Sequence, residues 1–198
     1  ADIMPLATVM ARLRDPEVGC PWDIVQDFAS IAPYTIEEAY EVVDAIERDD
    51  MAALRDELGD LLLQVAFHSR MAEEAGHFSV ADVIASISDK MVRRHPHIFA
   101  DPSVENWDWE AIKAEERSRG GAESAMDGVA LALPALMRAQ KLQKRAARVG
   151  FDWPDIAPVF DKVTEEMGEL RSEIDGGGSS ERVSEEAGDL LFSCVNLL

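Results

Sequence analysis

Apolar side chains recur every three or four positions along most of the chain, and this spacing predicts amphipathic helices. Residues 36–46 show the pattern first, and a longer helix is expected over 51–75, ended by Gly76. Ser79 is a good N-cap for a third helix that runs to Arg94 and stops before a proline. Strand patterns are weak throughout. The sequence therefore predicts an all-α protein in which helical hairpins pack into a bundle.

A different composition marks the middle of the chain. Between about residues 95 and 127 prolines, tryptophans and glycines interrupt the pattern, and only a short charged helix near 109–119 is expected. A new apolar pattern starts at Leu131. These changes predict one domain with its connector over 1–120 and a second, shorter domain over 121–198. The apolar pattern still continues at Leu198, so we expect the second domain to be truncated.

Three sequence motifs occur twice, in the same order. The pattern VGxxW occurs at 18–22 and 149–153, EExxE at 37–41 and 165–169, and ExGDLL at 57–62 and 186–191. Ordered repetition of this kind indicates duplication of one structural unit. We therefore expect a tandem repeat of helical-hairpin domains, each of the four-helix-bundle type once a second copy packs against it.

The repeated acidic motifs predict metal sites. In the first copy Glu38 and Glu41 share a helix face, and Glu57 and Asp60 share a face of the next helix. An antiparallel hairpin would bring these carboxylates together, where they repel one another unless a cation lies between them. Oxygen ligands of this kind suit Mg²⁺, with Mn²⁺ as a possible substitute. The equivalent set in the second copy is Glu166, Glu169, Glu186 and Asp189.

Two other interpretations of these acids compete with a magnesium site. EExxE is common on solvated faces of acidic helices, although pairing with ExxD and duplication make that explanation weaker. A ferritin-like di-iron site expects Glu-x-x-His, and neither ExxD segment has the histidine. Gly59 and Gly188 interrupt the helical pattern at about 1 kcal/mol each, which a close approach of another backbone would explain.

Magnesium held by carboxylates usually meets phosphates and can activate a water. Glu37, and Glu165 in the second copy, are candidates for the base that accepts the water proton. Lys90 and Arg94 lie four residues apart and could pair with phosphate oxygens. Solvent exposure or surface ion pairing explains these two basic residues equally well. Trp22 and Trp153 could stack on a nucleobase, although core packing is the more common role of such side chains.

The charge and hydropathy of the chain exclude two classes of binding partner. The formal net charge is −20, which argues against a nucleic-acid surface. No apolar run approaches the length that spans a bilayer, so no membrane partner is expected. The two cysteines, Cys20 and Cys194, are far apart and in no CxxC spacing, which is typical of a protein of the reducing cytoplasm.

Five segments together resemble the MazG family of bacterial nucleoside triphosphate pyrophosphohydrolases, within the all-α NTP pyrophosphohydrolase superfamily. They are GCPWD at 19–23, IAPYTIEEAYEV at 31–42, ELGDLL at 57–62, RRHPHIFAD at 93–101 and LPALMRAQKLQKRAARVGFDW at 133–153. The resemblance covers nearly the whole chain. It implies magnesium-dependent hydrolysis of the α–β anhydride of NTPs and dNTPs, with a nucleoside monophosphate and pyrophosphate as products, in a cytoplasmic homodimer.

Carried over by motif, the resemblance assigns metal binding to the two acidic sets above and phosphate binding to Lys90 and Arg94. Two-domain members tend to hydrolyse nucleotides in the C-terminal copy, whose basic helix would lie beyond Leu198. Two alternatives stay open: a non-catalytic helical dimer that binds nucleotide or a regulatory protein, and a specialised relative such as a dUTPase.

Overall fold

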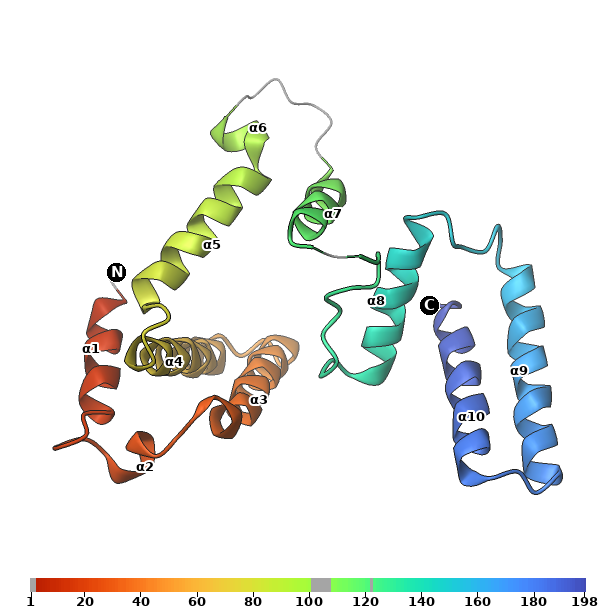
Figure 1. Ribbon diagram of the computed structural model, residues 1–198, viewed down its shortest axis with the longest axis horizontal. Helices are drawn as coiled ribbons and strands as arrows, with labels where there is room; N and C mark the ends of the chain where they lie inside the picture. The colour runs from red at the N-terminus through yellow and green to blue at the C-terminus, as the bar shows by residue number, and fades with distance from the viewer. Residues whose placement is uncertain (1–2, 101–107, 122) are drawn as a thin grey trace. The chain divides into compact units, whose positions relative to one another are not determined.

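The computed structural model describes residues 3–100, 108–121 and 123–198. Within them every regular element is an α-helix, which confirms the predicted all-α class (Figure 1). The chain divides into two compact units, 1–107 and 108–198. No helix among the described residues is both long enough and apolar enough to cross a membrane.

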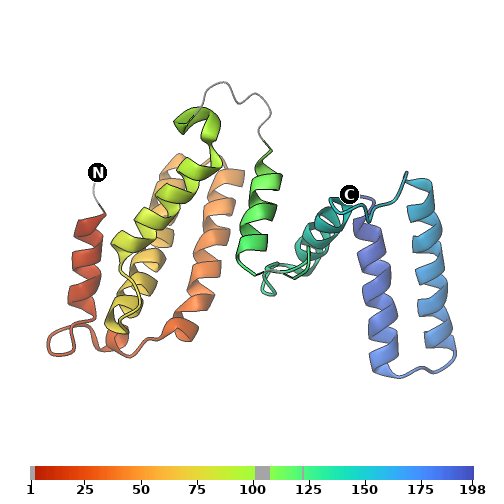
Figure 2. The same ribbon diagram turned by 45° about the horizontal axis from the view of Figure 1, so that its top comes forward.

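The first unit is built on an antiparallel helical hairpin. Its two long helices, α3 and α4, lie side by side in both ribbon views (Figures 1 and 2). The helices of this unit are α1 (Met4–Leu13), α2 (Pro21–Ile24), α3 (Phe28–Glu47), α4 (Met51–Glu74), α5 (Val80–Arg94) and α6 (Pro96–Phe99).

Helix α3 begins eight residues earlier than the apolar pattern predicted. Asp27 caps it by accepting a hydrogen bond from the Ser30 backbone N–H, and the Ser30 hydroxyl accepts one from the Asp27 N–H. This capping box satisfies backbone donors that the first helical turn cannot pair. The helix then continues through Pro33, which lacks a backbone N–H. The predicted start at 36 was therefore wrong, and the start signal is the Asp27–Ser30 pair.

The predicted ends of α4 and α5 are confirmed. Asp50 caps α4, and Gly76, just beyond its end, has a φ of 74°, which a residue with a Cβ adopts only with strain. Ser79 caps α5 in a reciprocal box with Asp82. These caps fix where α4 ends and where α5 begins.

The core of the first unit lies where α1 packs on α4 and the beginning of α3. Met10, Ile31 and Phe67 are almost completely buried, and Ala66 and Met71 complete the cluster. Most of the carboxyl-terminal half of α4 is covered in this way, whereas the half that carries Glu57 is more exposed.

The second unit also contains a helical hairpin. Its helices are α7 (Trp109–Arg119), α8 (Ala135–Ala147), α9 (Ala157–Asp175) and α10 (Ser180–Val195), and α9 and α10 pack side by side (Figure 2). The short helix predicted at 109–119 is confirmed. It groups with the second unit, whereas the predicted division at 120/121 placed it with the first. Connector residues 101–107 lie outside the described part of the chain.

Candidate metal centres

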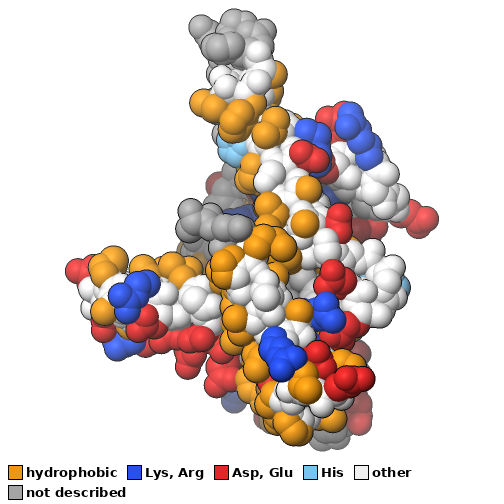
Figure 3. Space-filling model, turned by 90° about the vertical axis from the view of Figure 1, so that its left-hand side faces the viewer, with side chains coloured by type: hydrophobic (Ala, Val, Ile, Leu, Met, Phe, Trp, Pro, Cys, Tyr) orange, Lys and Arg blue, Asp and Glu red, His pale blue; other side chains and the backbone are white. Residues whose placement is uncertain are grey.

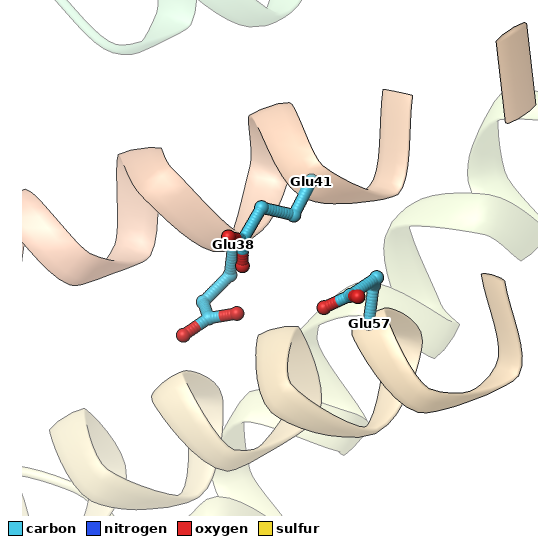
Figure 4. Close-up of side chains that lie close together, drawn as sticks. All are labelled: Glu38, Glu41 and Glu57. Carbon is cyan, nitrogen blue, oxygen red and sulfur yellow. The ribbon is translucent and has the colours of Figure 1, made fainter. Parts of the chain in front are cut away.

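Glu38, Glu41 and Glu57 form a cluster in the first hairpin. The first two project from α3 and the third from α4, into the space between the helices (Figure 4). One carboxylate oxygen of each lies within 4.8 Å of the others. The antiparallel hairpin thus brings together three of the four acids predicted for this site.

The electrostatics of this cluster disfavour three separate negative charges. Burial raises the pKa of Glu38, and the charges of Asp60 and Glu41 raise it further. Burial and then the charge of Glu41 likewise raise the pKa of Glu57. A divalent cation would relieve this repulsion, and a set of carboxylate oxygens is the donor chemistry that magnesium prefers. The residues present therefore fit the predicted metal.

A second cluster has the same pattern in the second hairpin. Glu166 and Glu169 on α9 and Glu186 on α10 again place one oxygen each within 4.8 Å of the others. Glu166 is buried, and burial raises the pKa of Glu186. The two clusters therefore use equivalent positions of the two sequence copies.

Basic side chains already occupy part of the second cluster. Lys162 Nζ lies 2.7 Å from a Glu166 oxygen, and Arg182 Nη2 lies 3.0 Å from a Glu186 oxygen. The hydrogen bonds to Glu166 and Glu165 raise the pKa of Lys162, and the charge of Glu173 is the main cause of a raised pKa at Arg182. Sequence reasoning missed both cations, although each stands four residues before its glutamate, a spacing that favours ion pairs on a helix.

The fourth acid predicted for each site lies outside the tight group. Asp60 and Asp189 are exposed, and neither belongs to the set of mutually close oxygens. Both are near enough for their charges to raise the pKa of a neighbour, Glu38 and Glu186 respectively. Their roles as metal ligands stay predictions.

Gly59 and Gly188 have no backbone segment packed closely against them among the described residues. A Cβ added to Gly59 or Gly188 would have no atom of the described chain within 4 Å. Among the described residues, therefore, the close backbone approach predicted for these positions is not found.

The candidate bases and phosphate-binding residues lie outside the carboxylate clusters. Glu37 is exposed on α3, and Glu165 is exposed and bonded to Lys162 at 3.1 Å. Lys90 and Arg94 lie on α5, a different helix from those that carry the Glu38, Glu41 and Glu57 carboxylates. Their catalytic and binding roles stay predictions.

The two tryptophans have different surroundings. Trp22 is about half exposed and meets the Tyr34 and Phe67 rings edge-on, at centroid distances of 6.3 and 6.4 Å. Trp153 lines a pocket of about 450 Å³ in the second unit, together with Phe151, Phe192 and Asn196. The packing of Trp22 agrees with the structural interpretation of that residue, while Trp153 borders open space.

Known proteins are similar in sequence to nearly the whole of this chain, which spans about three quarters of the length of the first of them. The sequence model of the MazG nucleotide pyrophosphohydrolase domain matches residues 26–99, the range that holds the first cluster. A nucleoside triphosphate pyrophosphohydrolase of Escherichia coli (strain K12) is 57% identical over 198 residues, which cover 97% of this chain and 75% of that protein. The chain belongs to the MazG family.

Other MazG relatives agree. The nucleoside triphosphate pyrophosphohydrolase/pyrophosphatase MazG of Thermotoga maritima is 44% identical over 97% of this chain and 73% of its own length. A nucleoside triphosphate pyrophosphohydrolase of Mycobacterium tuberculosis is 41% identical over 73% of this chain and 46% of its own length. The resemblance read from the sequence motifs is thereby confirmed.

Proposed function

We propose that this chain is a nucleoside triphosphate pyrophosphohydrolase that converts NTPs or dNTPs and water to nucleoside monophosphates and pyrophosphate. The main support is the 57% identity, over nearly the whole chain, to a protein of that name. The paired carboxylate clusters supply the matching chemistry, because hydrolysis of a polyphosphate requires cations to offset its charge.

The metal in this proposal is Mg²⁺, with Mn²⁺ able to replace it. Glu38, Glu41 and Glu57 would hold it in the first copy, with Asp60 at the edge of the site. Glu166, Glu169 and Glu186 would hold it in the second, with Asp189 at the edge. The bound ion would neutralise phosphate charge and lower the pKa of an attacking water.

The roles of the other site residues follow from the sequence motifs and from the chemistry of their side chains. Glu37 or Glu165, one residue before a cluster glutamate and exposed, would accept the water proton. Lys90 and Arg94 lie four residues apart on one face of α5 and would pair with phosphate oxygens. Trp153, beside an open pocket, would stack on the base, and Trp22 would do so from its exposed side.

The proposed architecture is a tandem repeat completed by a second copy of the chain. Exposed apolar residues on α3 recur at helical spacing at Ile36, Tyr40 and Val43, opposite the carboxylate face. Leu58, Leu62 and Val65 do the same on α4. Figure 3 shows orange apolar side chains at the surface among charged ones. Burial of these faces in a homodimer would supply core that each hairpin lacks.

The test is product analysis with the intact chain and Mg²⁺ across the eight common NTPs and dNTPs. We expect pyrophosphate and the monophosphate. Glu41→Gln and Glu169→Gln each remove one cluster ligand, so the variant that loses activity identifies the active copy. We expect the rate of hydrolysis to fall by more than about 100-fold. Replacing a residue that only supports a metal ligand already lowers activity by about 10–100-fold. Glu17→Gln, an exposed change outside both clusters, is the control.

Two results would contradict the proposal. Orthophosphate as the sole phosphate product would indicate a different phosphatase. Magnesium-dependent nucleotide binding without turnover would favour a non-catalytic binding module. A strong preference for dUTP over the other dNTPs would narrow the function to a specialised member.

A further inference from the structure

Three arginines of the second unit line one cavity that has no part in the proposed function. The cavity has a volume of about 280 Å³ and is lined by residues of α7, of α8 and of the loop at 123–125. Arg117 comes from α7, and Arg145 and Arg148 come from the end of α8. The formal net charge of the chain is −20, so a cavity lined mainly by cations differs from most of the molecule.

The acids around this cavity do not balance its positive charge. Glu110 lies 2.6 Å from Arg148 Nη1, but the same carboxylate also lies 2.6 Å from Lys113 Nζ. The hydrogen bond from Lys113 is the main cause of a lowered pKa at Glu110, and the charges of Arg148 and Arg117 lower it further. One carboxylate is thus shared among three cations. Glu123 is the one acid among the described residues that line the cavity.

Arg145 is fixed in place by backbone groups. Its Nη1 donates to the carbonyl oxygens of Ala125 and Asp127 in the loop before α8. A guanidinium group has five N–H donors, so those on Nε and Nη2 remain for another acceptor. Burial lowers the pKa of Arg145, and the charges of Arg117 and Arg148 lower it further. The three guanidinium groups therefore repel one another, and an anion in the cavity would relieve that repulsion.

We infer that this cavity is a binding site for a small phosphate anion, of the size of orthophosphate or pyrophosphate. Guanidinium groups donate pairs of hydrogen bonds to phosphate oxygens. Ser118 and Ser124 also line the cavity, and their hydroxyls can donate further hydrogen bonds. A volume of about 280 Å³ equals that of roughly nine water molecules, and pyrophosphate has about as many non-hydrogen atoms.

The arginine cavity is separate from the sites proposed above. It shares no lining residue with the carboxylate clusters or with the pocket beside Trp153. Leu142 and Ala146 of α8 line the pocket beside Trp153, whereas Arg145 and Arg148 line the arginine cavity. An anion bound between the arginines would therefore leave the carboxylate clusters unaltered.

Helix dipoles give a simpler explanation for two of the arginines. Arg117 and Arg145 lie in the last turns of α7 and α8, where a cation offsets the negative end of the dipole. Arg119 lies in the same turn as Arg117, but it pairs with Glu115 at 2.6 Å and does not line the cavity. A dipole role makes Arg117 and Arg119 equivalent, whereas an anion site makes them different. Arg119 is therefore the matched control.

The test is isothermal titration calorimetry of the intact chain with pyrophosphate and with orthophosphate, in low salt and EDTA. EDTA removes the divalent cations that would hold phosphate at the carboxylate clusters. We expect one pyrophosphate per chain with a Kd on the order of 0.1 mM, weakened by added NaCl because salt screens exposed charges. Tighter binding of pyrophosphate would assign a diphosphate to the site, and equal binding of the two ions would assign a single phosphate group.

Three variants locate the binding. Arg117→Ala should raise the Kd by about tenfold, because one charged donor is lost. Arg119→Ala should change the Kd by less than about twofold, because its charge is paired outside the cavity. Glu110→Gln should tighten binding, because it removes the carboxylate that pairs with Arg148. Circular dichroism of each variant verifies that the helices are intact.

Two results would overturn the inference. One is the absence of binding of both ions to the wild type in EDTA. The other is an equal loss of affinity in Arg117→Ala and Arg119→Ala, which would indicate general attraction to positive charge and not a site. Neither result bears on the proposed pyrophosphohydrolase, because no metal takes part in this measurement.

Discussion

Arg14 joins three segments of the first unit through one side chain that is only 8% exposed. Its Nη1 donates to the backbone carbonyls of Asp23 and Gln26, at 2.6 and 3.1 Å. Its Nε and Nη2 donate to the Glu74 carboxylate near the end of α4, with a shortest distance of 2.8 Å. These bonds, together with a Phe67 ring 5.4 Å from the guanidinium, hold the loop before α3 against α4.

Replacing Arg14 with Met should destabilise the protein by about 2–3 kcal/mol, because the Asp23 and Gln26 carbonyls each lose a charged donor and the partly buried Glu74 carboxylate keeps only Arg70. Urea unfolding followed by circular dichroism measures the change. Arg55→Met removes an exposed arginine that pairs with the adjacent Asp56 and should cost less than about 0.5 kcal/mol. Equal effects of the two changes would show that the buried bonds of Arg14 add no stability.

At the scale of helices, the contact of α3 with α4 includes a histidine whose charge is disfavoured. The His68 ring on α4 stacks on Phe28 of α3 at a centroid distance of 5.9 Å, and its Nε2 lies 3.0 Å from the Thr35 hydroxyl. Burial lowers the pKa of His68 below its usual value near 6.5. The contact between the helices therefore favours the neutral imidazole.

This shift makes the stability contributed by His68 dependent on pH. Because the folded pKa is lower than the unfolded one, the contribution is complete above about pH 6.5 and is lost as the pH falls through the folded pKa. We expect the difference in unfolding free energy between the wild type and His68→Gln to shrink between pH 7.5 and pH 5.

Helix positions were largely predictable, because local signals mark them. Ser79 with Asp82, and Gly76 with its positive φ, specify the ends of helices through a few neighbouring atoms. The start of α3 was missed because its capping box at Asp27 precedes the apolar repeat and Pro33 follows it. Proline usually disfavours the interior of a helix, but here the rest of α3 forms in spite of Pro33.

The sequence predicted the acidic residues of the candidate sites, but it did not predict the basic residues that pair with them. Spacing alone placed Glu38 and Glu41 on one face, and the hairpin supplied Glu57. Which carboxylates lie closest depends on how α3 and α4 rotate against each other, and this left Asp60 outside the tight group. The pairing of Lys162 and Arg182 with the second cluster depends on side-chain directions that composition does not specify.

At the scale of the whole molecule, the apolar pattern predicted the extents of α4 and α5 but did not show which helix faces would be covered. Ile36, Tyr40 and Val43 belong to the pattern that identified α3, and all three are exposed in the chain by itself. Leu58 and Leu62 on α4 are also exposed, beside Gly59, where a Cβ would meet no neighbour. Contiguous apolar faces of this kind are characteristic of association surfaces.

A homodimer that covers these faces predicts a definite response to a buried charge. Light scattering after size exclusion should give twice the mass of the 21.8 kDa chain for the wild type. Leu62→Glu should shift the protein toward the monomer, because an unpaired carboxylate inside an apolar interface is costly to desolvate. Leu131→Glu places the same charge at a residue that is 84% exposed in a loop and should leave the mass unchanged. A wild-type monomer at micromolar concentration would contradict the dimer, and the exposed faces of α3 and α4 would then require a different partner.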